Sequence, residues 1–191
     1  MNIDWNNEIA KKTALQAQLM ELSNLVSHAP PKSPASEEQI QTVERLLGFR
    51  LDTQYSQFLR HANGWENFLF ETMLFGTDDL LGRTGLSAHA WHHLGLFSPD
   101  GNLHEVFNFN GESRNLQVQR NELLPIGDTT ESLHMYFIAK PNSLLSGHVI
   151  MIQGSSVTEY DDFFTFFMRS MADDQFYIDE ALKEKWRSKQ V

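Results

Sequence analysis

Two short amphipathic helices are predicted to follow one another between residues 34 and 65. Their apolar positions recur at helical spacing and are Ile40, Val43, Leu47, Tyr55, Phe58, Leu59 and Ala62. Ser36 and Gln39 have the spacing of a capping box at the first helix start, and Gly48 suits the left-handed residue that ends a helix. Both helices need a partner for their apolar faces, and we predict that they pack on a sheet.

The rest of the pattern indicates strands in the middle of the chain and helices towards its ends. We predict helices at 4–27, at 86–96, from 161 onward and at 174–189, and strands at 68–75, 123–127, 133–139 and 148–152. Pro125 limits its strand to pairing on one side, because proline has no N–H to donate. Residues 103–120 show no clear pattern, and no element is predicted there. This order favours an α+β fold with a mixed, largely antiparallel sheet packed against N-terminal and C-terminal helices.

Composition narrows the class of protein. The chain has no cysteine, which excludes disulfides and thiolate metal ligands. Its first residues lack the basic and apolar regions of a secretory signal, and no apolar run approaches the roughly 20 residues that cross a bilayer. With 191 residues, the chain is long enough to bury a sizeable core. We expect a cytoplasmic protein that does not associate with membranes.

The charge of the chain is negative and unevenly distributed. The net charge is −10, and residues 61–110 contain one arginine against six acidic residues. Such a surface repels phosphate groups, so we expect no nucleic-acid partner, and it attracts a basic protein. The candidate partner-binding residues are Glu66, Asp78, Asp79, Asp100 and Glu105. Glu71 falls within the strand predicted at 68–75, where it can be paired inside. The alternative is an acidic surface that only keeps the protein soluble.

No pattern of catalytic residues is present. The H-E pair at 104–105 begins a metalloprotease motif, but Asn108 stands where the second zinc-binding histidine is required. The chain has no G-x-S-x-G nucleophile elbow, and the segment after Gly127 lacks the G-K-[ST] end of a phosphate-binding loop. We therefore expect a protein without enzymatic activity and without a cofactor.

Three histidines form an H-x-x-H-H pattern in the helix predicted at 86–96. On a helix His89 lies near both His92 and His93, and three imidazoles are able to bind a transition metal. No carboxylate occurs in residues 88–99 to complete such a site. Histidines beside an aromatic residue such as Trp91 more often pack or lie on the surface, so we predict no metal site here.

A series of motifs follows the order known from one group of domains. The capped helix ends in L-G-F-x-L, and it is followed by Y-x-x-F-L at 55–59 and N-G-W at 63–65. Downstream, L-L-P-I-G at 123–127 is similar to an L-x-P-I-G strand, and the Phe-rich helix at 160–171 is similar to an F-x-x-F-L element. Together these motifs resemble the SUKH superfamily of SMI/KNR-type domains over residues 34–172.

This resemblance implies an organisation and a function. On this basis residues 1–33 are expected to form a helical extension with a proline-rich connector. Residues 34–172 are expected to form the SMI/KNR-like domain, and residues 173–191 a C-terminal helix that packs on the same domain. Bacterial members of the superfamily mostly resemble immunity proteins that neutralise a cognate toxin, often a nuclease or deaminase. We therefore expect a protein that occludes a basic cognate toxin through its acidic surface. The alternative is a regulatory or scaffold module that binds cellular proteins, as fungal relatives do in cell-wall synthesis.

Overall fold

The computed structural model describes residues 3–22, 29–69, 71–96, 106–110, 115–129, 134–153 and 156–187. The helices are α1 (Trp5–Leu22), α2 (Glu37–Leu47), α3 (Thr53–Leu59), α4 (Thr77–Leu80), α5 (Leu86–Leu96) and α6 (Phe163–Arg187), with a 3-10 turn η1 (Arg120–Glu122). The strands are β1 (Trp65–Leu69), β2 (Thr72–Leu74), β3 (Val106–Asn110), β4 (Asn115–Gln119), β5 (Leu123–Asp128), β6 (His134–Ala139), β7 (Val149–Gln153) and β8 (Ser156–Tyr160). Within these ranges, no helix combines the length and the hydropathy that crossing a membrane requires.

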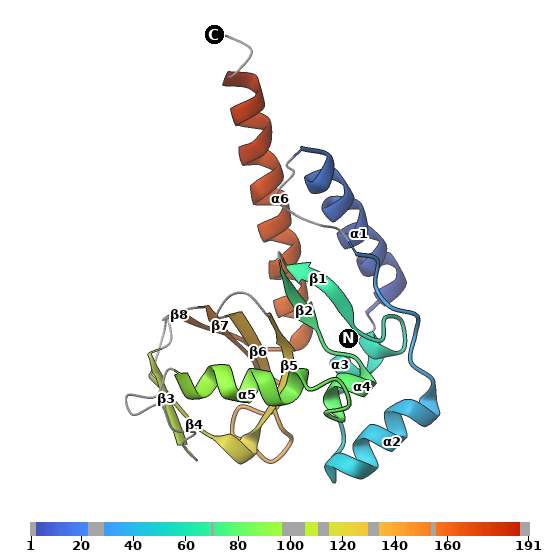
Figure 1. The fold of residues 1–191 in the computed structure, drawn as a ribbon, viewed down its shortest axis with the longest axis vertical. Coiled ribbons are helices and arrows are strands. Elements are labelled where there is room, and N and C mark those ends of the chain that lie inside the picture. Colours follow the sequence, from blue (N-terminus) through green and yellow to red (C-terminus); the bar gives the residue numbers. More distant parts are fainter. Residues whose placement is uncertain are drawn as a thin grey trace.

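A six-stranded sheet forms the centre of the molecule (Figure 1). Its strand order is β1-β2-β5-β6-β7-β8, and each neighbouring pair is antiparallel. β3 and β4 form a separate antiparallel pair. The predicted α+β fold is therefore confirmed.

Helices cover both faces of the sheet. The larger core lies between one face and α1, α3 and α6, and it includes Trp5, Phe58, Tyr136, Phe163 and Phe167. A smaller core lies on the other face and includes Leu94 of α5, Val118 of β4, Phe137, Ile150 and Ile152. Figure 1 shows α5 running across the front of the sheet, while α6 passes behind it and extends away beside α1.

The predicted pair of helices is confirmed as α2 and α3. Ser36 Oγ accepts a hydrogen bond from the Gln39 backbone N–H at 3.2 Å, and Gln39 Oε1 accepts one from the Ser36 N–H at 2.8 Å. Gly48 ends α2 with φ +78°, a backbone conformation that glycine adopts without steric cost. Asp52 caps α3 through hydrogen bonds from two backbone N–H groups. Capping and terminating residues within the segment therefore explain where α2 and α3 begin and where α2 ends.

The single strand predicted at 68–75 is wrong, because this region contains a turn. β1 and β2 form an antiparallel hairpin in which Leu69 pairs with Thr72, and Glu71 is exposed in the turn between them. The apolar run concealed this turn, although the polar pair at 71–72 interrupts it. Both halves are buried because the hairpin packs against the large core.

The C-terminal region contains one helix where two were predicted. α6 runs without a break from Phe163 to Arg187, so the segment boundary placed at 172/173 falls inside it. No glycine or proline interrupts residues 163–187, and Asp174 within the helix turns inward to bind Lys12 of α1.

α1 is anchored by residues that its hydrophobic pattern did not emphasise. Its buried face consists of Trp5, Ile9, Lys12, Gln16 and Leu19, and two of these side chains are polar. Leu15 and Leu22 have the helical spacing of Leu19 but are only partly buried. The first half of α1, through Trp5, Ile9 and Lys12, therefore makes much of the contact with the core.

The central strands follow the prediction more closely. β6 and β7 lie where strands were expected, and β5 contains Pro125, which pairs with Phe137 of β6. On the other side, β5 pairs with β2 only from Gly127 onward, so the predicted limit on pairing is confirmed. β8 was not predicted, nor were β3 and β4, which lie in or beside the region without a clear pattern.

Candidate functional site

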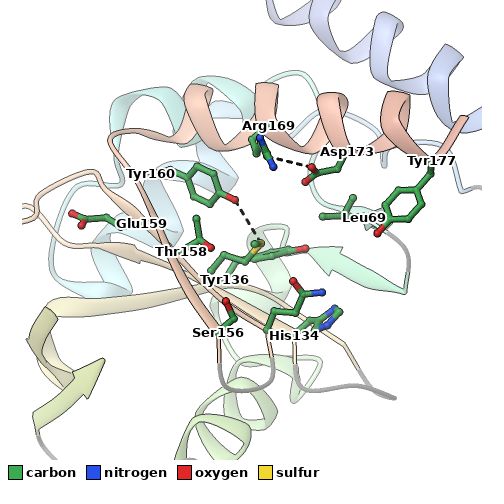
Figure 2. Close-up of a pocket in the computed structure, with 12 residues that line it drawn as sticks. Leu69, His134, Tyr136, Ser156, Thr158, Glu159, Tyr160, Arg169, Asp173 and Tyr177 are labelled. Atoms are coloured by element: carbon green, nitrogen blue, oxygen red, sulfur yellow. Dashed lines mark hydrogen bonds and ion pairs between the residues drawn. The ribbon is translucent and has the colours of Figure 1, made fainter. Parts of the chain in front are cut away.

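A groove of about 470 Å³ lies where α6 leaves the face of the sheet (Figure 2). Strands β6, β7 and β8 form its floor and α6 forms one wall. The lining residues are Leu69, His134, Tyr136, Met151, Gln153, Ser156, Thr158, Glu159, Tyr160, Arg169, Asp173 and Tyr177. Most of these residues carry a polar group, whereas small-molecule pockets are mostly apolar.

The register of the strands explains the floor of the groove. Tyr136, Met151 and Thr158 are directly paired across β6, β7 and β8, so their side chains share one face. His134, Gln153 and Ser156 form the next such row. Alternation along each strand therefore places both polar-rich rows on the face against which α6 packs, with Tyr136 buried at the floor of the groove.

The wall of the groove comes from one face of α6. Arg169, Asp173 and Tyr177 are four residues apart and lie along the same side of the helix, as Figure 2 shows. Arg169 Nε lies 3.2 Å from Asp173 Oδ1. Tyr177 is 41% exposed, so its ring is available at the open end of the groove.

Two groups in the floor have altered proton affinities. Burial raises the pKa of Tyr136 far above its ordinary value, so its hydroxyl stays protonated at physiological pH. Burial lowers the pKa of His134, an effect that the charge of Glu71 opposes. The Tyr160 hydroxyl lies 3.9 Å from the Met151 sulfur, to which it donates. The groove thus combines aromatic rings, hydroxyls and charged groups, a mixture typical of protein-binding surfaces.

Two of the acidic residues predicted to bind a partner are exposed, and each has a cation beside it. Glu66 lies on β1, and its Oε1 is 3.2 Å from Nζ of Lys32. Asp78 lies on α4, and its Oδ1 is 2.6 Å from a guanidinium nitrogen of Arg83. Both carboxylates are about half exposed, so they remain accessible to a partner.

Asp79 lies inside the protein, unlike its neighbour Asp78. It is 4% exposed, and its Oδ2 accepts a hydrogen bond from the Gly76 N–H at 2.7 Å. The Asp79 carboxylate therefore caps the N-terminus of α4. Asp78, Asp79 and Lys32 line a shallow hollow of about 340 Å³. Asp100 and Glu105 lie outside the described residues.

A third cluster lies on the opposite face of the sheet from the groove. His89 and His93 are one turn apart on α5, and both direct Nδ1 towards Asp128 at the end of β5, at 2.7 and 3.1 Å. Asp128 is completely buried, whereas His92 points away and is exposed. Sequence reasoning sought a carboxylate close to the histidines and missed Asp128. The i, i+4 spacing and the acid that ends a buried strand were the available signals.

Comparison with known proteins gives one clear relationship. Residues 34–180, well over half of the chain, match the SMI1 / KNR4 family (SUKH-1). No curated protein matches the chain significantly. The match spans the capped helices, the whole central sheet and most of α6. The chain therefore belongs to the SMI1/KNR4 family (SUKH-1).

Proposed function

We propose that this protein is a non-enzymatic immunity protein that neutralises a cognate bacterial toxin by binding it and occluding its active surface. Membership of the SMI1/KNR4 family carries this proposal, because bacterial SUKH domains mostly resemble immunity proteins. The groove beside α6 supports it, since an exposed tyrosine and an arginine at the rim are the residue types enriched at interface hot spots.

The charge of the chain suggests the kind of toxin. A net charge of −10 favours encounter with a basic partner and disfavours nucleic acid. A nuclease that binds phosphates needs a basic cleft, and an acidic protein can enter that cleft and exclude the substrate. Glu66 and Asp78 are the accessible carboxylates of the predicted acidic set, and Asp173, whose side chain is 28% exposed, lies in the wall of the groove.

Co-expression tests the function directly. The reading frames beside the gene for this protein are searched for a toxin, and the C-terminal domain of any toxin found is expressed in cells with or without this protein. The expected result is growth only when both are present, together with a complex of the two purified proteins. Growth arrest despite full expression of this protein, or binding to several unrelated cellular proteins with no rescue, would favour a regulatory module instead.

Substitutions in the groove test where the toxin binds. Tyr177→Ala combined with Arg169→Ala removes the aromatic ring and the guanidinium group from the α6 wall. We expect the toxin to bind at least about 10-fold more weakly, the loss that removing one strong interface contact causes. Met168→Ala is the matched control, because Met168 is exposed on α6 but does not line the groove.

A second pair of substitutions tests the acidic residues separately. Glu66→Lys with Asp78→Lys reverses both accessible charges, and Glu21→Lys with Glu184→Lys reverses two exposed charges on α1 and α6. If the acidic surface guides the toxin, association slows in the first variant and not in the second. Equal association rates in the two variants would show that the acidic surface does not guide the toxin. The groove would then be the remaining candidate for the binding surface.

A further inference from the structure

We propose that His89, His93 and Asp128 form a binding site for a divalent transition-metal ion such as zinc. The bound ion joins α5, which carries both histidines, to β5, which carries Asp128. Among the described residues these three side chains are a group whose potential ligand atoms all lie within 4.8 Å of one another. One helical turn separates the two histidines, and their ring centres are 4.0 Å apart. Both rings therefore approach the same carboxylate, one at each oxygen.

The burial of Asp128 makes its carboxylate a favourable ligand for a cation. A carboxylate removed from water is costly unless a positive charge or several hydrogen bonds compensate for it. Asp128 is 0% exposed, and within the described residues its side chain contacts His89 and His93. An ion held between the two rings and the carboxylate compensates the charge with bonds to all three groups.

The ligand types select the class of metal. Imidazole nitrogens suit zinc, copper, nickel and iron, whereas magnesium and calcium prefer oxygen ligands alone. Two histidines with one carboxylate leave one position of a tetrahedral zinc ion for water. The His89 side chain is 37% exposed and the His93 side chain 12% exposed, so an ion can enter from the solvent side of α5.

The site has a structural consequence for the smaller core. α5 covers the sheet through Leu94 and through Trp91, whose ring lies 5.2 Å from that of Phe137. A metal ion that bonds to α5 and to the end of β5 holds this helix on the sheet. Because the ion binds the folded protein, it raises the melting temperature in proportion to the logarithm of its concentration.

Metal titration of the full chain tests this site. The protein is prepared without a histidine tag, treated with a chelator, and titrated with Zn²⁺ by calorimetry and with Co²⁺ by visible absorption. We expect one ion per chain, a Co²⁺ spectrum of low coordination number, a higher melting temperature with Zn²⁺, and no such effects with Mg²⁺.

Three single variants locate the binding. His89→Gln and His93→Gln each keep an N–H donor for Asp128 but remove an imidazole ligand, so these variants are designed to fold. Each substitution should weaken Zn²⁺ binding by about 100-fold or more. Loss of a group that only hydrogen-bonds to a metal ligand already costs about 10–100-fold in affinity. His92→Gln is the matched control on the same helix and should bind Zn²⁺ like the wild type. Absence of Zn²⁺ binding to the wild type, or equal affinity in all four proteins, would overturn the proposal.

Discussion

Lys12 and Asp174 form an ion pair that is almost closed to solvent. Nζ of Lys12 lies 2.8 Å from Oδ2 of Asp174, and the two side chains are 0% and 4% exposed. The same ammonium group lies 4.3 Å from the centre of the Phe68 ring. Burial lowers the pKa of Lys12 and raises the pKa of Asp174, while their mutual attraction opposes both shifts. Each charge is therefore tolerated in the core because the other is present.

Removing one member of this pair should destabilise the protein strongly. Lys12→Met leaves the Asp174 carboxylate buried without its cation, and we expect a loss of about 3–5 kcal/mol in the free energy of unfolding. The double variant Lys12→Met with Asp174→Leu should recover most of that loss, because an apolar pair needs no compensation. Urea denaturation of the wild type and both variants measures these differences.

The neighbouring Lys11 provides the control for this prediction. It binds Glu8 at 2.8 Å, but its side chain is 52% exposed. Lys11→Met should cost no more than about 1 kcal/mol, since solvent screens an exposed pair. A loss in Lys12→Met as small as that in Lys11→Met would show that the buried pair is not needed. A double variant no more stable than Lys12→Met would show that the loss does not come from the unpaired Asp174 carboxylate.

Two buried tyrosines should make the protein sensitive to alkali. Burial raises the pKa of Tyr55 and of Tyr136 well above the ordinary value, and the Tyr55 hydroxyl donates to the Phe75 carbonyl at 2.7 Å. Unfolded tyrosines lose their protons near pH 10, whereas these two keep theirs in the folded state. Rising pH therefore favours the unfolded protein, and stability should fall from about pH 10 upward.

Denaturation at several pH values between 8 and 11 measures this dependence. The double variant Tyr55→Phe with Tyr136→Phe has no phenol at these positions, so its stability should fall less steeply over the same range. Its stability at pH 8 is lower because the Phe75 carbonyl loses the hydrogen bond from Tyr55, but the slope is the quantity compared. An identical slope in both proteins would contradict the assignment to these residues.

At the scale of elements, α1 is part of the folded core although it lies outside the family match. The Trp5 ring lies within 6 Å of the ring centres of Phe58, Phe163, Phe164 and Phe167, and it is 1% exposed. Gln16 of α1 also donates hydrogen bonds to two backbone carbonyls of β1. The helix therefore completes the aromatic core that α3 and α6 begin.

Truncating Trp5 should accordingly weaken the whole fold. Trp5→Ala leaves a large cavity among aromatic rings, and we expect a cost of about 3–5 kcal/mol in unfolding free energy. Met20→Ala on the same helix is the control, because Met20 is 44% exposed, and its cost should stay near zero. Thermal unfolding of the two variants distinguishes them, and equal melting temperatures would mean that α1 is only loosely attached.

The elements also differ in how far local patterns predicted them. α2 and α3 carry their own start and stop signals, so their prediction succeeded. The β1–β2 hairpin and the continuous α6 were mispredicted, because the apolar run at 68–75 fits one strand or two, and the apolar positions of residues 161–189 fit one helix or two. Contacts with the core choose between these interpretations, and such contacts are not visible in a short window of sequence.

At the scale of the whole molecule, the net charge of −10 should govern how the proposed complex forms. Charges attract at a distance only within the screening length, which shrinks from about 10 Å at 0.1 M salt to about 3 Å at 1 M. We expect association with a basic toxin to slow by about 10-fold or more across this range, with a smaller change in dissociation. Stopped-flow mixing measures both rates, and an association rate independent of salt would argue against electrostatic guidance.

The candidate sites were less predictable than the fold. Glu66 and Asp78 are accessible, as a partner-binding role requires, but Asp79 is buried where it caps α4. Neighbours in sequence face different ways here because the backbone turns, and the acidic pattern alone contains no information about that turn. The groove was not predicted at all, since its floor depends on the register of three strands and its wall on the path of α6.

The sequence by itself determined the family, the α+β class and the capped helices, because periodicity and capping act over a few neighbouring residues. Only the tertiary structure decided which polar groups meet in the interior. Lys12 and Asp174 are 162 residues apart, and His93 and Asp128 are 35 apart. No local signal connects such residues, since their proximity arises only when the helices pack on the sheet. The proposed metal site and the groove therefore depend on packing that no single segment encodes.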